Sequence, residues 1–295
     1  MISVIICTRN TNALSTVTAN VAATVGVPHE IIAIDNSRGQ YGICEAYNIG
    51  ASRAQYELLC FMHEDVHHHT KQWGRIVTDI LADLGIGVLG VAGGTYQVDA
   101  PAGWGGGGWP RVRMQVMHTL KSQESVIDHH YVTDSPLVDV ATLDGLWLCC
   151  RKTVWQEFQF DHVTFPGFHF YDVDFCTRVF TKYRNCVTFD ILIEHFSHGS
   201  FDKVWYANAL HYYQQRRHLL PFGVEDMSAS EASQLSLSVL HQFTSTYIDH
   251  HISLKGAMFL VRECLKRAPF NRNSLWLVKK LLKTRQRQAH RLVSH

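Results

Sequence analysis

The sequence predicts an α/β fold with a mostly parallel central sheet flanked by helices, followed by a helical C-terminal extension. Apolar runs typical of buried strands alternate with helical stretches over the first ninety residues. Four of these runs end in polar residues, and such strand–helix–strand repetition is typical of right-handed crossovers between parallel strands. From residue 228 onward the pattern is helical, with a break at Pro269.

Each element can be placed from its own pattern. Residues 2–8 (ISVIICT) are the first expected strand, and a helix follows to about Val25, where Gly26 and Pro28 interrupt it. The other expected strands are 31–37, 56–63, 87–94, 143–152 and 186–200, and the other expected helices are 42–54, one starting near Asp172, 203–220 and those beyond 228. We therefore expect a sheet domain at 1–222 and a basic helical extension at 223–295.

Composition narrows the class of protein. With 295 residues and 46% hydrophobic content, the chain can bury a substantial core. The sequence has no run of 18 apolar residues, so no membrane span is predicted. The N-terminus enters a strand pattern and lacks the features of a signal peptide. The eight cysteines form no CxxC pair, so we expect reduced thiols and a cytoplasmic protein.

Charge is distributed unevenly along the chain. From Arg262 to His295 there are ten basic residues and one acidic residue, whereas the preceding part holds 17 basic and 25 acidic residues. A body of net charge about −8 thus carries a tail of about +9. The acidic body argues against an enzyme that binds along nucleic-acid phosphates, so we expect no nucleic-acid partner.

A glycine-rich stretch lies in the middle of the chain, where residues 103–108 read GWGGGG. Five glycines in six positions lose much backbone entropy on ordering, so we expect a mobile loop. The stretch does not match GxxxxGK[ST] and no strand–GxGxxG–helix context surrounds it. This excludes a phosphate-binding P-loop and a dinucleotide-binding fingerprint.

Residues 56–66 read YELLCFMHEDV, an apolar run that ends in His63, Glu64 and Asp65. Open α/β sheets bind ligands just outside the carboxyl ends of their strands, where these acids would lie. Packing explains two acids at such a place poorly, whereas a divalent cation explains them well. The alternative is that Glu64 and Asp65 are solvated acids that cap a following helix.

The segments SVIICTRN, IIAIDNS, ICEAYNIGASRAQYELLCFMHEDV and YDVDF, in this order, resemble the family-two glycosyltransferases of the GT-A fold. The resemblance covers about residues 2–220 and is greatest to a subgroup related to a streptomycin-biosynthesis protein. Two positions depart from the family pattern. The metal motif is His63-Glu64-Asp65 in place of two or three aspartates, and Tyr171 stands where many members have a glutamate.

The resemblance implies a nucleotide-sugar donor, with UDP-sugars favoured, and Mn²⁺ or Mg²⁺ at the diphosphate. Hard cations take oxygen ligands, so Asp65 is the first expected metal ligand and Glu64 the second. Mn²⁺ also accepts imidazole, which brings in His198 or His195, and we select His198 because its neighbours Ser197 and Gly199 are more typical of a site.

By its place in YDVDF, Asp172 is the candidate general base that takes the proton of the acceptor hydroxyl. Asp174 has an alternative role as a cap of the helix that starts near Phe175. A single base without a covalent intermediate implies an inverting enzyme. The implied acceptor is a surface-glycan or lipid-linked precursor of polysaccharide biosynthesis.

Further polar residues follow the expected strands or lie near them, and the resemblance assigns them to the nucleotide sugar. Asp35 would accept a hydrogen bond from the base, Asp144 would contact the transferred sugar, and Arg53 would approach the diphosphate. The full donor-binding set is Thr8, Arg9, Asn10, Asp35, Asn48, Arg53, Glu64 and Asp144. For each of them a simple turn-forming role is the alternative.

The C-terminal segment 275–293 is predicted to be a basic amphipathic helix with Leu275, Val278, Leu281 and Leu282 on one face. Such a helix suits an anionic membrane surface, here the inner face of the membrane. Equally, its apolar face could pack on the body of the protein or on the second subunit of a homodimer.

Two other functions remain open. A sugar-phosphate nucleotidyltransferase shares the general sheet architecture, but it needs a glycine-rich basic loop, and TRNTNALS supplies one arginine and no glycine. A degenerate glycan-binding or scaffolding module would keep the fold without holding metal at His63-Glu64-Asp65. Metal-dependent nucleotide binding distinguishes the enzyme from this module.

Overall fold

The computed structural model describes residues 1–119, 125–130, 133–197, 199 and 201–293. The chain forms two compact units. The sheet unit comprises 1–97, 103–199 and 222–225, and the helical unit comprises 98–102, 200–221 and 226–295. Helix α6 (Lys203–Arg216) therefore groups with the C-terminal helices, whereas the sequence analysis assigned it to the first domain. As a division into independently folding domains, the boundary after residue 222 stays a prediction.

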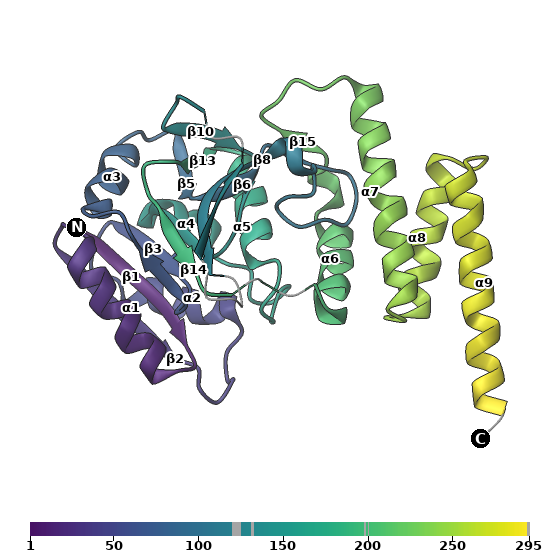
Figure 1. The fold of residues 1–295 in the computed structure, drawn as a ribbon, viewed down its shortest axis with the longest axis horizontal. Coiled ribbons are helices and arrows are strands. Elements are labelled where there is room, and N and C mark those ends of the chain that lie inside the picture. Colours follow the sequence, from purple (N-terminus) through teal and green to yellow (C-terminus); the bar gives the residue numbers. More distant parts are fainter. Residues whose placement is uncertain (120–124, 131–132, 198, 200, 294–295) are drawn as a thin grey trace. The chain divides into compact units, whose positions relative to one another are not determined.

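The main sheet of the sheet unit has seven strands (Figure 1). Their order is β10 (Leu137–Val140), β13 (Arg184–Thr188), β5 (Ile86–Gly90), β12 (Trp147–Arg151), β3 (Leu58–Met62), β1 (Ile2–Thr8) and β2 (His29–Asp35). The pairs β1–β2, β1–β3 and β5–β13 are parallel, and the other three are antiparallel. Five of the seven strands thus run in the same direction, as expected, whereas β12 enters between β3 and β5 in the opposite direction to both and β10 runs opposite to β13.

A second sheet has the order β11 (Thr142–Leu143), β6 (Ala92–Gly94), β8 (Val112–Thr119), β14 (Ile193–His195) and β4 (Val66–His68), and β9 (Ser125–His130) pairs with β8. Three expected strands are therefore each two strands in different sheets. The expected strand 87–94 divides at Val91 into β5 and β6, 143–152 divides into β11 and β12, and 186–200 divides into β13 and β14. In each case most residues of both halves are buried, so the apolar pattern does not reveal the bend.

The sheet unit also contains the helices α1 (Thr11–Thr24), α2 (Ile43–Arg53), α3 (Trp73–Ile80), α4 (Lys152–Phe158) and α5 (Tyr171–Phe180). A short sheet of β7 (Tyr96–Gln97) and β15 (Phe222–Gly223) and the 3₁₀ turn η1 (Trp109–Arg111) complete it. Helix α1 starts where the Asn10 side chain accepts hydrogen bonds from the backbone N–H groups of Asn12 and Ala13. Helix α2 contacts β1 at Gly50, where any Cβ would meet Ile5 at 2.3 Å. The hydrophobic core of this unit is made of buried side chains, among them Ile, Val, Met and Trp residues.

The helical unit consists of α6, the 3₁₀ turn η2 (Arg217–Leu219), α7 (Ala229–Asp249), α8 (Leu254–Arg267) and α9 (Arg272–Val293). In α9 the buried side is centred on Ser274 and Leu277, whereas Leu275 and Leu282 are 46% and 52% exposed. The expected apolar face is therefore divided, since only part of it packs on α7 and α8. No described helix is long and apolar enough to cross a membrane.

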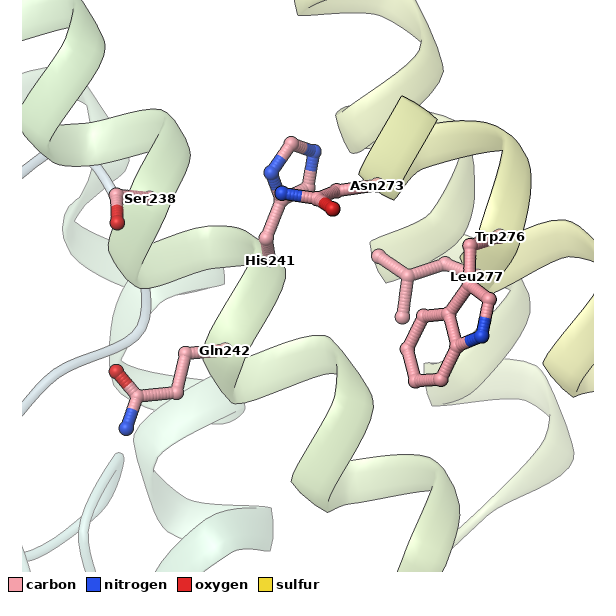
Figure 2. Close-up of a pocket in the computed structure, with 6 residues that line it drawn as sticks. All are labelled: Ser238, His241, Gln242, Asn273, Trp276 and Leu277. Carbon is pink, nitrogen blue, oxygen red and sulfur yellow. The ribbon is translucent and has the colours of Figure 1, made fainter. Parts of the chain in front are cut away.

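A pocket lies between α7 and α9 within the helical unit. Figure 2 shows its lining, which comprises Ser238, His241, Gln242, Asn273, Trp276 and Leu277. Nε2 of His241 lies 2.9 Å from the Ser274 hydroxyl, so part of the polar lining is engaged in holding the helices together. None of the site residues predicted from the sequence lines this pocket.

Candidate active site

The predicted acids gather at one edge of the main sheet. Strands β1, β2 and β3 are parallel and end at this edge, which we call the carboxyl edge. Strand β12 is antiparallel to β3 and pairs Trp147 with Met62, so the turn before β12 lies there as well. The N–H of His63 donates to the carbonyl oxygen of Leu146 at 3.1 Å, which fixes this turn against the end of β3.

Glu64 is engaged by the loop between β1 and α1. Its carboxylate accepts hydrogen bonds from the Thr8 hydroxyl at 2.5 Å and from the backbone N–H groups of Arg9 at 3.1 Å and Asn10 at 3.2 Å. These bonds connect the end of β3 to the end of β1. The structure thus gives Glu64 a role in shaping the loop, and this role uses the oxygens expected to face a metal or a nucleotide.

His63, Asp65 and His195 form the one cluster among the described residues with the arrangement of a metal site. One ligand atom from each lies within 4.8 Å of the other two. Nδ1 of His63 is 3.9 Å and Nε2 of His195 is 3.4 Å from Oδ1 of Asp65. Strand β14 pairs His195 with Val66, the residue after Asp65, and this register brings the two segments together. His198, selected from the sequence, lies outside the described residues.

The electrostatics of the cluster favour an ionised acid. Burial opposes ionisation of Asp65, but its hydrogen bond with His195 and the charges of His195 and His63 hold its pKa at about 2. Burial likewise disfavours the charged form of His195, yet Asp65 outweighs it and raises the pKa of His195. Burial and the nearby His195 lower the pKa of His63, which favours its neutral form. A neutral imidazole and a carboxylate are the forms that bind metals, so Asp65 and His63 are already in these forms, whereas a cation would have to displace the proton that Asp65 favours on His195.

Asp172 lies in the first turn of α5, and its Oδ2 accepts a hydrogen bond from the N–H of Gly145 at 2.9 Å. Burial and then the charge of Asp144 raise the pKa of Asp172 to about 7, although hydrogen bonds from backbone N–H groups oppose the shift. Asp144 itself accepts a hydrogen bond from the N–H of Leu146 in the turn before β12. A carboxyl group with a pKa near neutrality has the property that a general base needs.

Asp174 has a different environment from Asp172. Its side chain is 1% exposed, and its carboxylate forms an ion pair with Arg178 at 2.8 Å, one helical turn later. Arg178 also donates to the backbone carbonyl oxygens of Phe158 and Gln159. Asp174 therefore ties α5 to the segment after α4. It does not cap a helix near Phe175, as the alternative for it proposed, because α5 already begins at Tyr171.

Of the remaining predicted donor-binding residues, the structure brings some to the carboxyl edge and not others. Asp35 is exposed at the end of β2, beside Thr8 in the sheet register, and hydrogen bonds from Ser37 lower its pKa. Asn10 caps α1. Arg53 lies at the end of α2 that leads into the start of β3, which is the opposite edge of the sheet, so the structure does not bring it to the site.

Asn48 is used for packing. Its Nδ2 donates to the carbonyl oxygen of Phe160 at 2.7 Å, and its Oδ1 accepts from Nε1 of Trp155 at 2.9 Å and from the N–H of Phe160 at 3.0 Å. The side chain therefore anchors the segment after α4 to α2. These contacts occupy both ends of the amide that the sequence analysis directed toward the nucleotide.

Sequence reasoning missed two members of the cluster as chosen ligands. The sequence shows His63 only as part of a motif, and the neighbours of His198 favour it over His195. The signal for His195 is the short strand β4, which follows Asp65. Such a strand must pair with another strand, and its partner β14 ends at His195, so the pairing brings His195 to Asp65. Tyr171 was noted only as a departure, but its hydroxyl lies 2.7 Å from Nε2 of His63.

The chain is similar to a known protein family and to proteins of known structure. A family model described as a glycosyltransferase-like family matches residues 3–218. No curated protein sequence matches the chain. The chain is similar to the structure of Staphylococcus aureus TarS 1–349 in complex with UDP, with 12% identity, coverage of 96% of this chain and 88% of that chain, and a TM-score of 0.58. For the same protein in complex with UDP-GlcNAc, identity and coverage are the same and the TM-score is 0.53.

At this identity the likeness to TarS shows a shared fold. Together with the family match it confirms the expected fold class, a GT-A α/β architecture with C-terminal helices.

Proposed function

Because the chain belongs to the glycosyltransferase-like family, whose model covers residues 3–218, we propose that it moves a sugar from a nucleoside-diphosphate donor to a hydroxyl acceptor by a metal-assisted, inverting mechanism. UDP-sugars are the favoured donors, by the TarS complexes with UDP and UDP-GlcNAc. That the chain is an enzyme of the nucleotide-sugar glycosyltransferase class follows from the family itself. The narrower streptomycin-related subgroup stays a prediction.

One observation carries the proposal. Asp65 and Asp172 lie at the same edge of the sheet, but their carboxyl groups differ strongly in acidity. The pKa of Asp65 is about 2 and that of Asp172 is about 7. Environments that push the pKa values of neighbouring groups apart are how one site obtains distinct chemical roles. Asp65, which is ionised near neutral pH and lies beside His63 and His195, suits cation binding, and Asp172, which accepts from the N–H of Gly145, suits proton transfer.

The residues present fit a divalent cation. His63, Asp65 and His195 offer two imidazole nitrogens and one carboxylate oxygen that lie within 4.8 Å of one another. When bound, a Mn²⁺ or Mg²⁺ ion would neutralise the negative charge that develops on the leaving diphosphate. Glu64 keeps the β1–α1 loop closed beside this cluster, and Thr8, Arg9 and Asn10 in that loop are the proposed contacts of the nucleotide.

Asp172 is the proposed base. As the acceptor oxygen attacks the sugar carbon, the proton of the acceptor hydroxyl moves to the Asp172 carboxylate, and the bond to the diphosphate breaks. The N–H of Gly145 orients the carboxylate throughout, since it donates to Oδ2. With one base and no covalent intermediate, the configuration at the sugar carbon is inverted.

A thermal-shift panel tests the proposal. UDP, GDP, CDP and dTDP are each added with and without Mn²⁺, because a ligand that binds the folded state raises the melting temperature by mass action. A shift for one nucleotide that requires the metal supports the enzyme and identifies the base of the donor. If none of the four shifts the melting temperature under either condition, the result favours a degenerate, non-catalytic module.

The acidity of Asp172 predicts the pH dependence of the reaction. A base with a pKa of about 7 is ionised above this value, so kcat should rise with pH through about 7 and level off. Asp144→Asn removes the second cause of the raised pKa while its oxygen can still accept from Leu146. We expect this variant to move the rising limb of the kcat–pH profile to lower pH. An unmoved limb would show that another group controls it.

An aromatic surface that could hold the acceptor lies beside the site. Phe168 is 56% exposed and its ring lies 5.7 Å from that of His63, so it offers an acceptor sugar an aromatic surface beside the site. A surface-glycan or lipid-linked acceptor, a homodimer and a cytoplasmic location stay predictions.

Membrane contact through α9 stays a prediction that can be measured directly. Leu275, Trp276 and Leu282 are exposed on this helix, and the neighbouring Lys279 and Lys283 are exposed too. An amphipathic surface of this kind binds anionic headgroups. We expect the protein to sediment with vesicles that contain an anionic lipid, and Leu275→Ser with Leu282→Ser to weaken the effect. Equal sedimentation with neutral vesicles would contradict an electrostatic contribution.

A further inference from the structure

The two departures from the family pattern contact each other. By the resemblance to the family-two glycosyltransferases, His63 stands where the metal motif usually has an aspartate, and Tyr171 stands where many members have a glutamate. They are 108 positions apart in the chain, yet Nε2 of His63 and the hydroxyl of Tyr171 are 2.7 Å apart. A pair of departures that form one hydrogen bond suggests that they act together.

The hydrogen bonds of Tyr171 define which nitrogen of His63 carries the proton. The Tyr171 hydroxyl donates to the carbonyl oxygen of Gly145 at 2.8 Å, and a carbonyl oxygen can only accept. The hydroxyl has a single proton, so it must accept from Nε2–H of His63. The lone pair of the neutral imidazole is then on Nδ1, the nitrogen that is 3.9 Å from Oδ1 of Asp65.

Gly145 makes this arrangement possible. A Cβ at this position would lie 2.1 Å from the Tyr171 hydroxyl, so only glycine allows the close approach of the ring. The same residue donates its N–H to Asp172. One peptide segment therefore holds both the hydroxyl that orients His63 and the carboxyl group of the proposed base.

We propose that Tyr171 is a positioning residue that fixes His63 as a nitrogen ligand through Nδ1. The cation site of this chain then has two imidazoles and one carboxylate as ligands. Such a site selects Mn²⁺ over Mg²⁺. The inference rests on the proposed metal-assisted function. Imidazole is a poor ligand for Mg²⁺, which demands oxygen donors, whereas Mn²⁺ accepts both kinds. Outer residues that orient a ligating histidine typically change metal affinity 10- to 100-fold.

The first test removes only the hydroxyl. Tyr171→Phe keeps the ring, which packs against Tyr47, Phe160 and Phe168. Mn²⁺ affinity is measured from the electron paramagnetic resonance signal of free Mn²⁺, which needs no catalysis. We expect the affinity to fall about 10- to 100-fold. The matched control is Tyr183→Phe, which removes a hydroxyl that donates to Glu157 in the same unit, and we expect it to leave Mn²⁺ affinity unchanged.

The second test separates positioning from a general structural role. His63→Asp restores the usual oxygen ligand, so we expect the ratio of Mn²⁺ to Mg²⁺ affinity to fall, as measured by Mg²⁺ competition. In this background Tyr171→Phe has no imidazole to orient and should cause no further loss of Mn²⁺ affinity.

The outcomes are distinguishable. An equal loss on Tyr171→Phe in both backgrounds, or none in the wild type, overturns the positioning role while metal binding and the proposed function stand. Failure of the wild-type protein to bind Mn²⁺ overturns both. Near-UV circular dichroism of each variant establishes that the protein measured is folded.

Discussion

Asp172→Asn is expected to abolish sugar transfer while donor binding persists. The amide cannot take the proton of the acceptor hydroxyl, and loss of a general base typically costs about 10²- to 10⁴-fold in rate. The substitution preserves the shape of the side chain, and its oxygen can still accept from the N–H of Gly145. We expect kcat to fall by this factor and the metal-dependent thermal shift with nucleotide to be unchanged. Transfer at the wild-type rate would exclude Asp172 as the base.

The same variant should be more stable than the wild type at high pH. Burial raises the pKa of Asp172 to about 7, whereas the pKa of an unfolded aspartate is about 3.9. The folded state therefore holds the proton more tightly, and stability falls by up to about 1.4 kcal/mol per pH unit between these values, with no further loss above about 7. Asn carries no charge, so Asp172→Asn should raise the melting temperature at pH 8 and change it little at pH 4.

Asp174→Asn is the matched variant for this prediction of the melting temperature. Asp174→Asn breaks the buried ion pair with Arg178 and leaves the guanidinium without its partner. We expect it to lower the melting temperature at pH 8. Two acids two residues apart should therefore respond in opposite directions. A lower melting temperature for both variants would show that Asp172 contributes to the fold rather than opposing it.

Asp65→Asn is expected to abolish metal binding. The carboxylate is the only charged oxygen donor of the cluster formed by His63, Asp65 and His195 among the described residues. Removing it should lower Mn²⁺ affinity by more than the roughly 100-fold that is the upper range for outer-shell partners, and transfer should fall in parallel. Isothermal titration with Mn²⁺ measures the affinity, and addition of excess Mn²⁺ should not restore transfer.

Two matched substitutions identify the acid responsible. Glu64→Gln changes the neighbouring acid, whose oxygens accept from Thr8, Arg9 and Asn10, and we expect it to retain most of the Mn²⁺ affinity. Asp83→Asn removes an exposed acid that precedes β5, at the opposite edge of the sheet, and should have no effect on metal binding. If Glu64→Gln lost as much affinity as Asp65→Asn, the two acids would share the cation.

Much of the fold could be predicted because its signals are local. The apolar runs of β1, β2 and β3 alternate with helical stretches, and Asn10 and Gly42 mark helix starts. The bends at Val91 and in the turn before β12 could not be predicted, because the chain is buried on both sides of each bend. The antiparallel entry of β12 is likewise a matter of which strands pair, and pairing between distant segments leaves no trace in a single sequence.

Only part of the candidate site could likewise be predicted from the sequence. Asp65 and Asp172 follow recognisable motifs, so the sequence brought both to attention. Glu64 and Asn48 show the limit, because a polar residue near a strand end can equally serve its own backbone, and only the three-dimensional contacts distinguish these uses. His195 reaches Asp65 through the register of β14 with β4, which joins segments about 130 residues apart.

The pairing of β14 with β4 also has a consequence for how the protein matures. Ribosomes deliver the chain from its N-terminus, at about 5–20 residues per second. His63 and Asp65 emerge early, but His195 follows only after β5, β12 and α5 have been made. A nascent chain therefore holds an incomplete set of donors until β14 inserts between β8 and β4. Capture of the cation would then report that translation has passed β14 and that the strand has found its place.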